Sequence, residues 1–107
     1  MSNEINDRAV LRAAEKFADE TAKALRVNVP RLPGQTDRAW ERATAKVNVP
    51  AQLARLRVLY RGFQLAISCV KNGARDSKFG SDALLIASYE RKLANIAAQG
   101  KALAGTK

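Results

Sequence analysis

The sequence contains no histidine and a single cysteine, and these absences exclude several kinds of chemistry. Among its 107 residues, Cys69 has no second cysteine with which to close an intramolecular disulfide. A structural zinc site of the Cys and His type needs ligands that the chain does not have. We therefore expect no metal and no disulfide, so that packing alone must hold the fold together.

The lack of histidine also argues against catalysis. Histidine is the side chain best suited to general acid and base work near neutral pH, and it is the usual partner of a Ser or Cys nucleophile. The ten acidic residues are scattered among lysines and arginines, and no glycine-rich phosphate loop of the Walker or Rossmann type appears. We expect a binding protein without catalytic residues or a cofactor, and not an enzyme.

The sequence also lacks long hydrophobic runs. No apolar stretch approaches the 18 residues of a membrane span, and the N-terminus has neither the basic nor the apolar region of a secretory signal. We expect a soluble, cytoplasmic protein that does not bind membranes. Because 47% of its residues are hydrophobic, the chain should fold, and at 11.7 kDa residues 1–107 should form one domain with one core.

Hydrophobic residues recur at helical spacing in four segments, which are about 4–26, 36–47, 50–71 and 82–103. The helical segments are separated by stop signals, such as Pro30, and Gly73 is suited to the left-handed position after a helix. Ser81 or Asp82 can cap the last helix. The sequence predicts an all-α fold, a small bundle of about four helices with a long antiparallel C-terminal helical hairpin.

The helix at 50–71 is predicted to be the central member, because its apolar residues cover about two thirds of its circumference, wider than the stripe of a surface helix. The same reasoning places Phe17, Trp40 and Tyr60 against the core. Gly100 lies on the predicted inner face of the last helix, where it should allow a close approach between helices.

The string Val-Asn-Val-Pro occurs twice, at 27–30 and 47–50. It can mark a small internal duplication, each unit being a helix with its stop signal. The simpler interpretation, which we favour, is that both copies are connectors in which Asn caps and Pro starts the next element.

Positive charge is confined to one part of the chain. Residues 1–30 carry five acids and five bases, so the formal net charge of +9 belongs to residues 31–107. The candidate binding residues form three basic features: the stripe Arg38, Arg42 and Lys46; the strip Arg57, Arg61 and Lys71; and the loop Arg75, Lys78 and Phe79. If these features converge on one face, their field should attract an anionic partner.

We expect the protein to bind nucleic acid through its phosphate backbone, without catalysis. The alternative is a protein interaction module, an adaptor, inhibitor or assembly subunit such as one from a mobile element, whose basic face docks on an acidic protein. A third hypothesis is a homodimer that covers the wide apolar arc of the central helix. Basic residues also commonly serve only to keep a helical bundle soluble.

Overall fold

The computed structural model describes residues 5–78 and 80–105, and all regular structure within them is helical. The four helices are α1 (Asp7–Leu25), α2 (Asp37–Val47), α3 (Val49–Lys71) and α4 (Asp82–Ala104). The prediction of an all-α bundle is confirmed, and the main difference in bounds is that α1 begins at Asp7 rather than near residue 4. No helix in the described ranges is both long enough and apolar enough to cross a membrane.

Three of the four helices begin at a residue whose side chain caps them. Asn6, Thr36 and Ser81 each accept a hydrogen bond from the backbone N–H three residues further on, at 2.8, 3.1 and 3.2 Å. The exception is α3, where Asn48 occupies the capping position without such a bond and Pro50 lies in the first turn. Because Pro needs no hydrogen-bond acceptor for its nitrogen, α3 can start there almost without a break from α2.

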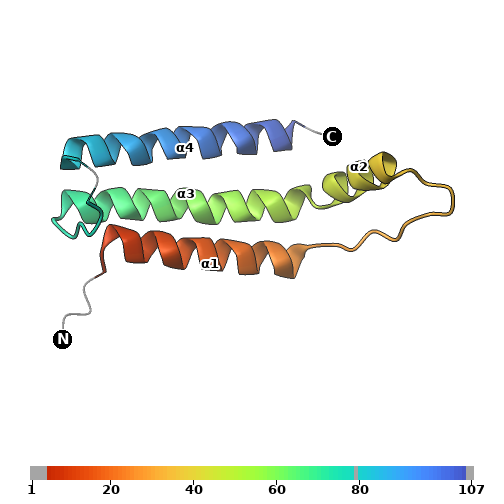
Figure 1. Cartoon of the computed structure of the whole chain (residues 1–107), viewed down its shortest axis with the longest axis horizontal. Helices are drawn as coiled ribbons and strands as arrows, with labels where there is room; N and C mark the ends of the chain where they lie inside the picture. Colours follow the sequence, from red (N-terminus) through yellow and green to blue (C-terminus); the bar gives the residue numbers. More distant parts are fainter. Residues whose placement is uncertain (1–4, 79, 106–107) are drawn as a thin grey trace.

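The helices form a flat layer with α3 in the middle (Figure 1). Both α1 and α4 pack against α3 in antiparallel orientation, and in the described part of the chain their backbones do not approach each other. The molecule measures 57 × 29 × 18 Å. Its radius of gyration is 17.5 Å, against about 13 Å for a compact domain of this length. The prediction that the helix at 50–71 is central is confirmed.

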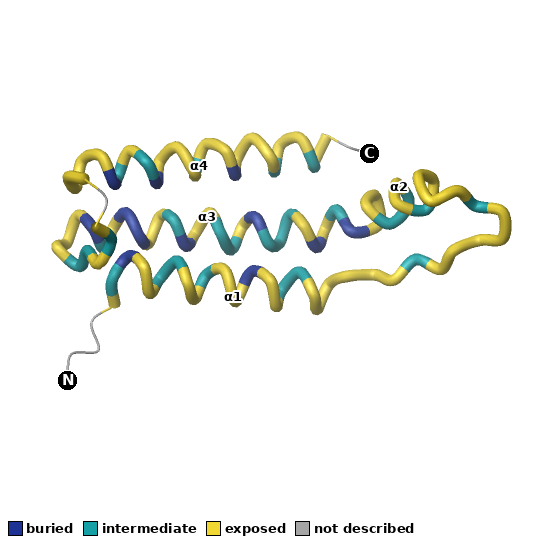
Figure 2. The backbone as a smooth tube through the Cα atoms, in the orientation of Figure 1, coloured by how far each residue is buried: buried dark blue, intermediate teal, exposed yellow. Residues whose placement is uncertain are grey.

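The core is small because a layer one helix thick covers α3 on only two sides. Its main cluster of buried residues comes from α3 and α4: Ala66, Ile67, Val70, Leu85 and Tyr89. Figure 2 shows the buried positions as short patches on the sides where neighbouring helices face each other. Most of the surface of α1, α2 and α4 is therefore exposed.

Three aromatic residues do not lie where the sequence predicted. Phe17 is 60% exposed and lies outside the core. Tyr60 is 36% exposed and lies at the edge of the contact between α3 and α4, beside Ile96 and Ala97. Trp40 is half-buried, and its indole N–H donates to the backbone oxygen of Val29 at 2.8 Å. Trp40 thus fixes the connector between α1 and α2 and is not a core anchor.

The close approach between helices is at Gly62 and not at Gly100. A Cβ added to Gly62 would overlap the Cβ of Ala14, whereas a Cβ added to Gly100 would meet no atom within 4 Å. Two small residues therefore set the distance between α1 and α3. The expectation for Gly100 was wrong because helix periodicity gives the inward face but not the point of contact along it.

The two Val-Asn-Val-Pro strings play different roles. The side chain of Asn48 accepts from the N–H of Val27 at 2.6 Å and donates to its carbonyl oxygen at 3.0 Å. It also donates to the carbonyl oxygen of Thr44 at 2.8 Å. The second string thus holds the first in place by satisfying the backbone of the connector, while Asn28 is exposed.

The opposite end of the layer is closed by the carboxylate of Asp7, which is fully buried. One oxygen accepts from the backbone N–H groups of Asp76 and Ser77 at 2.7 and 3.3 Å, and the other accepts from the hydroxyls of Ser77 and Tyr89, both at 2.6 Å. Asp7 therefore joins the start of α1 to the α3–α4 loop and to α4.

These hydrogen bonds change the acidity of the groups that make them. Burial by itself raises the pKa of Asp7, but the bonds from Asp76, Ser77 and Tyr89 outweigh burial and lower this pKa from 3.8 to about 2. The pKa of Tyr89 is raised by burial and by its bond to the Asp7 carboxylate. Asp7 is therefore a charged anchor at neutral pH.

Candidate binding surfaces

The basic stripe predicted on the second helix lies at one end of the molecule. Arg38, Arg42 and Lys46 are exposed on α2, which extends past the C-terminal end of α4 (Figure 1). Spacing by four residues places them along one side of this helix. Within the described residues, none of the three forms an ion pair.

The basic loop lies at the other end, after α3. Lys78 is exposed in this loop, whereas Arg75 is half-buried and bonded within the molecule. Lys71, the third residue of the predicted strip, is the last residue of α3 and is exposed at the start of the loop. The Arg75 guanidinium donates to the backbone oxygens of Ser77 and Gly80 at 2.7 and 2.5 Å and forms an ion pair with Asp82 at 2.7 Å. Arg75 therefore shapes the loop. Phe79 lies outside the described residues.

The three basic features do not converge on one compact site. The α2 stripe and the loop are separated by the 23 residues of α3, which is about 34 Å of helix. Arg57 and Arg61 lie between them, near the middle of α3. Helical spacing within a segment indicated which cations share a side, but it gave no information on how far apart the segments would lie.

Arg57 and Arg61 border an apolar groove between α1 and α3. The groove has a volume of about 790 Å³, and its lining residues are Val10, Ala13, Ala14, Lys16, Phe17, Glu20, Arg57, Val58, Arg61, Gly62 and Leu65. We call it the α1–α3 groove. Sequence reasoning identified the two arginines but missed the apolar surface beside them.

The small residues in this groove explain why it exists. Ala14 and Gly62 bring the two helices together and fill little space, so the larger side chains beside them are left uncovered. Phe17 from α1 is 60% exposed and Leu65 from α3 is 43% exposed. Exposed apolar residues that gather in one groove are typical of an interaction site, whereas single ones are not.

The charge around the α1–α3 groove is positive. Its lining contains Lys16, Arg57 and Arg61 and one acid, Glu20, so its formal net charge is 3 − 1 = +2. None of these four residues makes an ion pair within the described part of the chain. Both arginines are also exposed.

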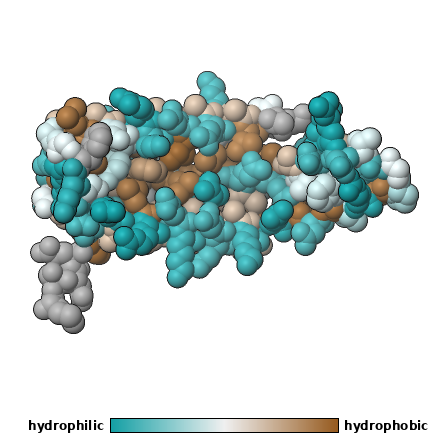
Figure 3. All heavy atoms as spheres, in the orientation of Figure 1, coloured by the Kyte–Doolittle hydropathy of each residue, from teal (hydrophilic) through white to brown (hydrophobic). Residues whose placement is uncertain are grey.

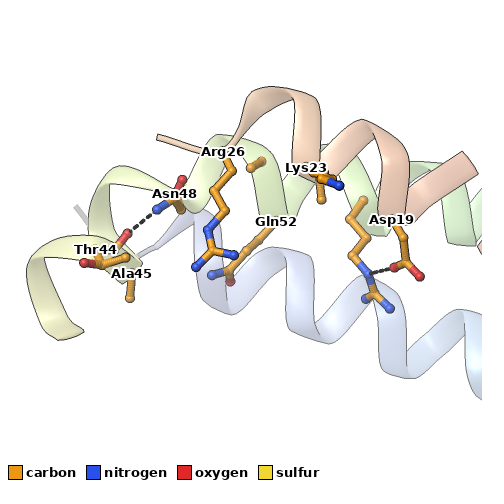
Figure 4. A pocket seen from close by; sticks show the side chains of 10 residues that line it. Asp19, Lys23, Arg26, Thr44, Ala45, Asn48 and Gln52 are labelled. Carbon is orange, nitrogen blue, oxygen red and sulfur yellow. Dashed lines mark hydrogen bonds and ion pairs between the residues drawn. The ribbon is translucent and has the colours of Figure 1, made fainter. Parts of the chain in front are cut away.

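A second basic pocket lies where α1, α2 and α3 meet, and the sequence did not predict it. Figure 4 shows Lys23 and Arg26 from the end of α1 on one side and Gln52 of α3 on the other. The pocket has a volume of about 510 Å³ and also includes Arg55, whose Nε bonds to Asp19 at 3.0 Å. It was missed because Lys23 and Arg26 belong to the first 30 residues, whose total charge is zero.

Comparison with known proteins adds no assignment. No protein-family model, curated protein or solved structure matches the chain.

Proposed function

We propose that this protein is a non-catalytic interaction module that holds an acidic, amphipathic helix of a partner protein in the α1–α3 groove. The observation that carries the proposal is the position of Arg57 and Arg61, which lie beside the exposed Phe17 and make no ion pair with any described carboxylate. An adaptor, an inhibitor or an assembly subunit would work in this way.

The shape of the groove favours a helix as the occupant. Helices pack by placing a ridge of side chains into the groove of a neighbour, and a furrow between two helices accepts a third in this manner. Phe17 and Leu65 offer apolar contacts to the ridge, and the small residues Ala13, Ala14 and Gly62 leave room for it. Aromatic residues and arginines contribute much of the binding energy at protein interfaces.

The charge favours an acidic occupant over a basic one. A helix with Glu or Asp beside its apolar stripe would place carboxylates near Arg57 and Arg61 and would leave no buried charge unpaired. The net charge of +9 would also speed the approach of an acidic partner, and this effect would weaken as salt rises.

The proposal can be tested by fluorescence anisotropy with a labelled helical peptide of about 20 residues, long enough to run along the groove. The peptide carries Leu at positions i, i+3, i+4 and i+7 and Glu on the flanking positions. A second peptide has Lys in place of Glu, and a third has the first composition in scrambled order. We expect binding of the first peptide only, and equal binding of all three would contradict the proposal.

Variants of the protein locate the binding. Phe17→Ser should weaken binding of the Glu peptide about ten-fold or more, because truncation of an aromatic interface anchor costs about 2 kcal/mol. Leu84→Ser is the matched control, since Leu84 is 59% exposed on α4, outside the groove. The charge reversal Arg57→Glu/Arg61→Glu should also weaken binding, while Arg91→Glu, at an exposed position outside the groove, should not.

Binding to a nucleic-acid backbone is the second candidate function. It is supported by the exposed stripe Arg38, Arg42 and Lys46, which lies at the same end as Lys23 and Arg26 of the basic pocket. If this candidate is right, labelled duplex DNA or RNA should bind at low salt, with an affinity that falls linearly with salt on logarithmic axes. Arg38→Glu/Arg42→Glu should abolish that binding, and no binding at low salt would exclude this function.

A further inference from the structure

A second groove lies between α1 and α4, with α3 as its floor. It shares no lining residue with the α1–α3 groove. Its volume is about 520 Å³. Because the backbones of α1 and α4 do not approach each other in the described part of the chain, Leu59 and Phe63 of α3 remain only half-buried at the floor of this groove. Figure 3 shows hydrophobic residues along the middle of one face of the molecule, with hydrophilic residues on both sides. We call this site the α1–α4 groove.

The chain exposes more surface than a compact monomer of its size. Its accessible surface is 7857 Å², whereas a monomeric protein of 11.7 kDa exposes about 5,900 Å². The difference, about 2,000 Å², exceeds the roughly 800 Å² that each partner buries in a standard protein interface. The excess over the whole chain is thus large enough for one standard interface. Because the two grooves share no lining residue, a second molecule in the α1–α4 groove would not need the residues of the α1–α3 groove.

The charges bordering the α1–α4 groove balance, unlike those of the α1–α3 groove. Glu15 and Asp19 lie on α1, while Arg55 lies on α3 and Lys92 on α4. Arg55 pairs with Asp19 at 3.0 Å. This pairing leaves Glu15 and Lys92 on opposite borders of the groove, and neither makes an ion pair with a described residue. The border of the groove therefore carries one acid on α1 and one base on α4 that are not paired with each other. A second copy of the same groove can place its base opposite this acid and its acid opposite this base.

We propose that the occupant of the α1–α4 groove is a second copy of this chain, related by a two-fold axis that runs parallel to α3. This rotation places α3 over α3 in the same direction and exchanges the positions of α1 and α4. Glu15 of each copy then faces Lys92 of the second copy, and Leu59 and Phe63 of the two copies cover each other.

The charges also select this axis over the alternative. A two-fold axis between the two layers, parallel to their planes but perpendicular to α3, would place α1 over α1, with Glu15 and Asp19 of the two copies on the same side. Like charges at an interface oppose association. The parallel arrangement is therefore the one in which both borders find opposite charge.

Sedimentation equilibrium of the full chain tests the proposal. The wild-type protein should show twice the 11.7 kDa monomer mass at high micromolar concentration. Glu15→Lys and Lys92→Glu should each raise the dimer dissociation constant about ten-fold or more, because each change converts two symmetry-related attractions into repulsions. The double variant Glu15→Lys/Lys92→Glu should restore the wild-type constant, since it exchanges the charges without losing their complementarity.

Matched controls are Glu90→Lys and Arg91→Glu, which reverse exposed charges of α4 outside the groove and should leave dimerisation unchanged. Circular dichroism confirms that each variant is folded. A wild-type protein that remains monomeric would overturn the proposal, as would a double variant that stays as weak as the single ones. Because the groove is separate, peptide binding by a monomer would leave the proposed function intact while rejecting the dimer.

Discussion

Asp7→Asn should destabilise the protein through the loss of one charged acceptor at the end of the layer. The Asp7 carboxylate accepts four hydrogen bonds from Asp76, Ser77 and Tyr89. In the variant, the Asn amide group places an NH₂ among these donors, where it cannot accept. One or two of the donors are then left buried without a partner, which is the costly outcome.

The size of the stability loss in Asp7→Asn follows from the lowered pKa of Asp7. The pKa of Asp7 is lowered from 3.8 to about 2, and a shift of this size corresponds to about 2 kcal/mol of stability at neutral pH. Because the folded-state pKa is the lower one, this contribution is present above about pH 4 and is lost as the pH falls towards about pH 2. For a chain of this length, about 2 kcal/mol lowers the melting temperature by about 8 to 10 °C.

Thermal unfolding followed by circular dichroism, at neutral pH and along an acid series, measures both effects. At neutral pH, Asp7→Asn should melt about 8 to 10 °C below the wild type. The difference between the two proteins should then shrink between about pH 4 and pH 2, since only the wild type loses the Asp7 contribution. Asp76→Asn, at an exposed carboxylate in the same loop, is the control and should melt like the wild type. A variant as stable as the wild type, or a difference that stays constant with pH, would refute the reasoning.

Two further substitutions, each with a matched control, test how the helices and the connector are held. Gly62→Ala should lower the free energy of unfolding by about 1 to 3 kcal/mol, because the new methyl group overlaps Ala14, and urea unfolding measures it. Gly100→Ala should leave the free energy of unfolding unchanged or raise it by up to about 1 kcal/mol, since the new methyl group meets no atom within 4 Å. Equal effects at Gly62 and Gly100 would contradict the close contact between Gly62 and Ala14. Asn48→Ala should cost about 1 to 3 kcal/mol through three lost hydrogen bonds. Asn28→Ala, at the exposed Asn of the first Val-Asn-Val-Pro string, should cost little stability. Similar losses for Asn28→Ala and Asn48→Ala would contradict the different roles of the two strings.

The helices could be predicted from local signals in the sequence, because capping residues, prolines and glycines mark where helices begin and end. Ser81, one of the two predicted caps, caps α4, and Gly73 adopts the predicted left-handed conformation, with φ 83°. The wide apolar arc of α3 correctly predicted a central helix. Caps, helix stops and apolar faces are determined by residues that are close together in the sequence, so they can be predicted without knowing the fold.

The arrangement of the layer could not be predicted in the same way. The apolar face of α1 contains Phe17, but which part of that face is covered depends on where Ala14 meets Gly62, a contact between distant segments. Each basic feature was predicted from the spacing of residues within one segment. The distances between the features depend on how α2 and α3 are oriented relative to each other, which this spacing does not give. The role of Asn48 was also hidden, because its partner Val27 lies in another connector.

The most direct test of the proposed function is to map peptide binding on the protein by NMR. The probe is the acidic amphipathic peptide, added to isotope-labelled full-length chain, with backbone amide shifts followed for each residue. We predict that the shifts concentrate on residues 10–17 of α1 and 58–65 of α3, and that they disappear in Arg57→Glu/Arg61→Glu. Shifts confined to α2, or an unchanged spectrum at millimolar peptide, would contradict the assignment of the α1–α3 groove as the binding site.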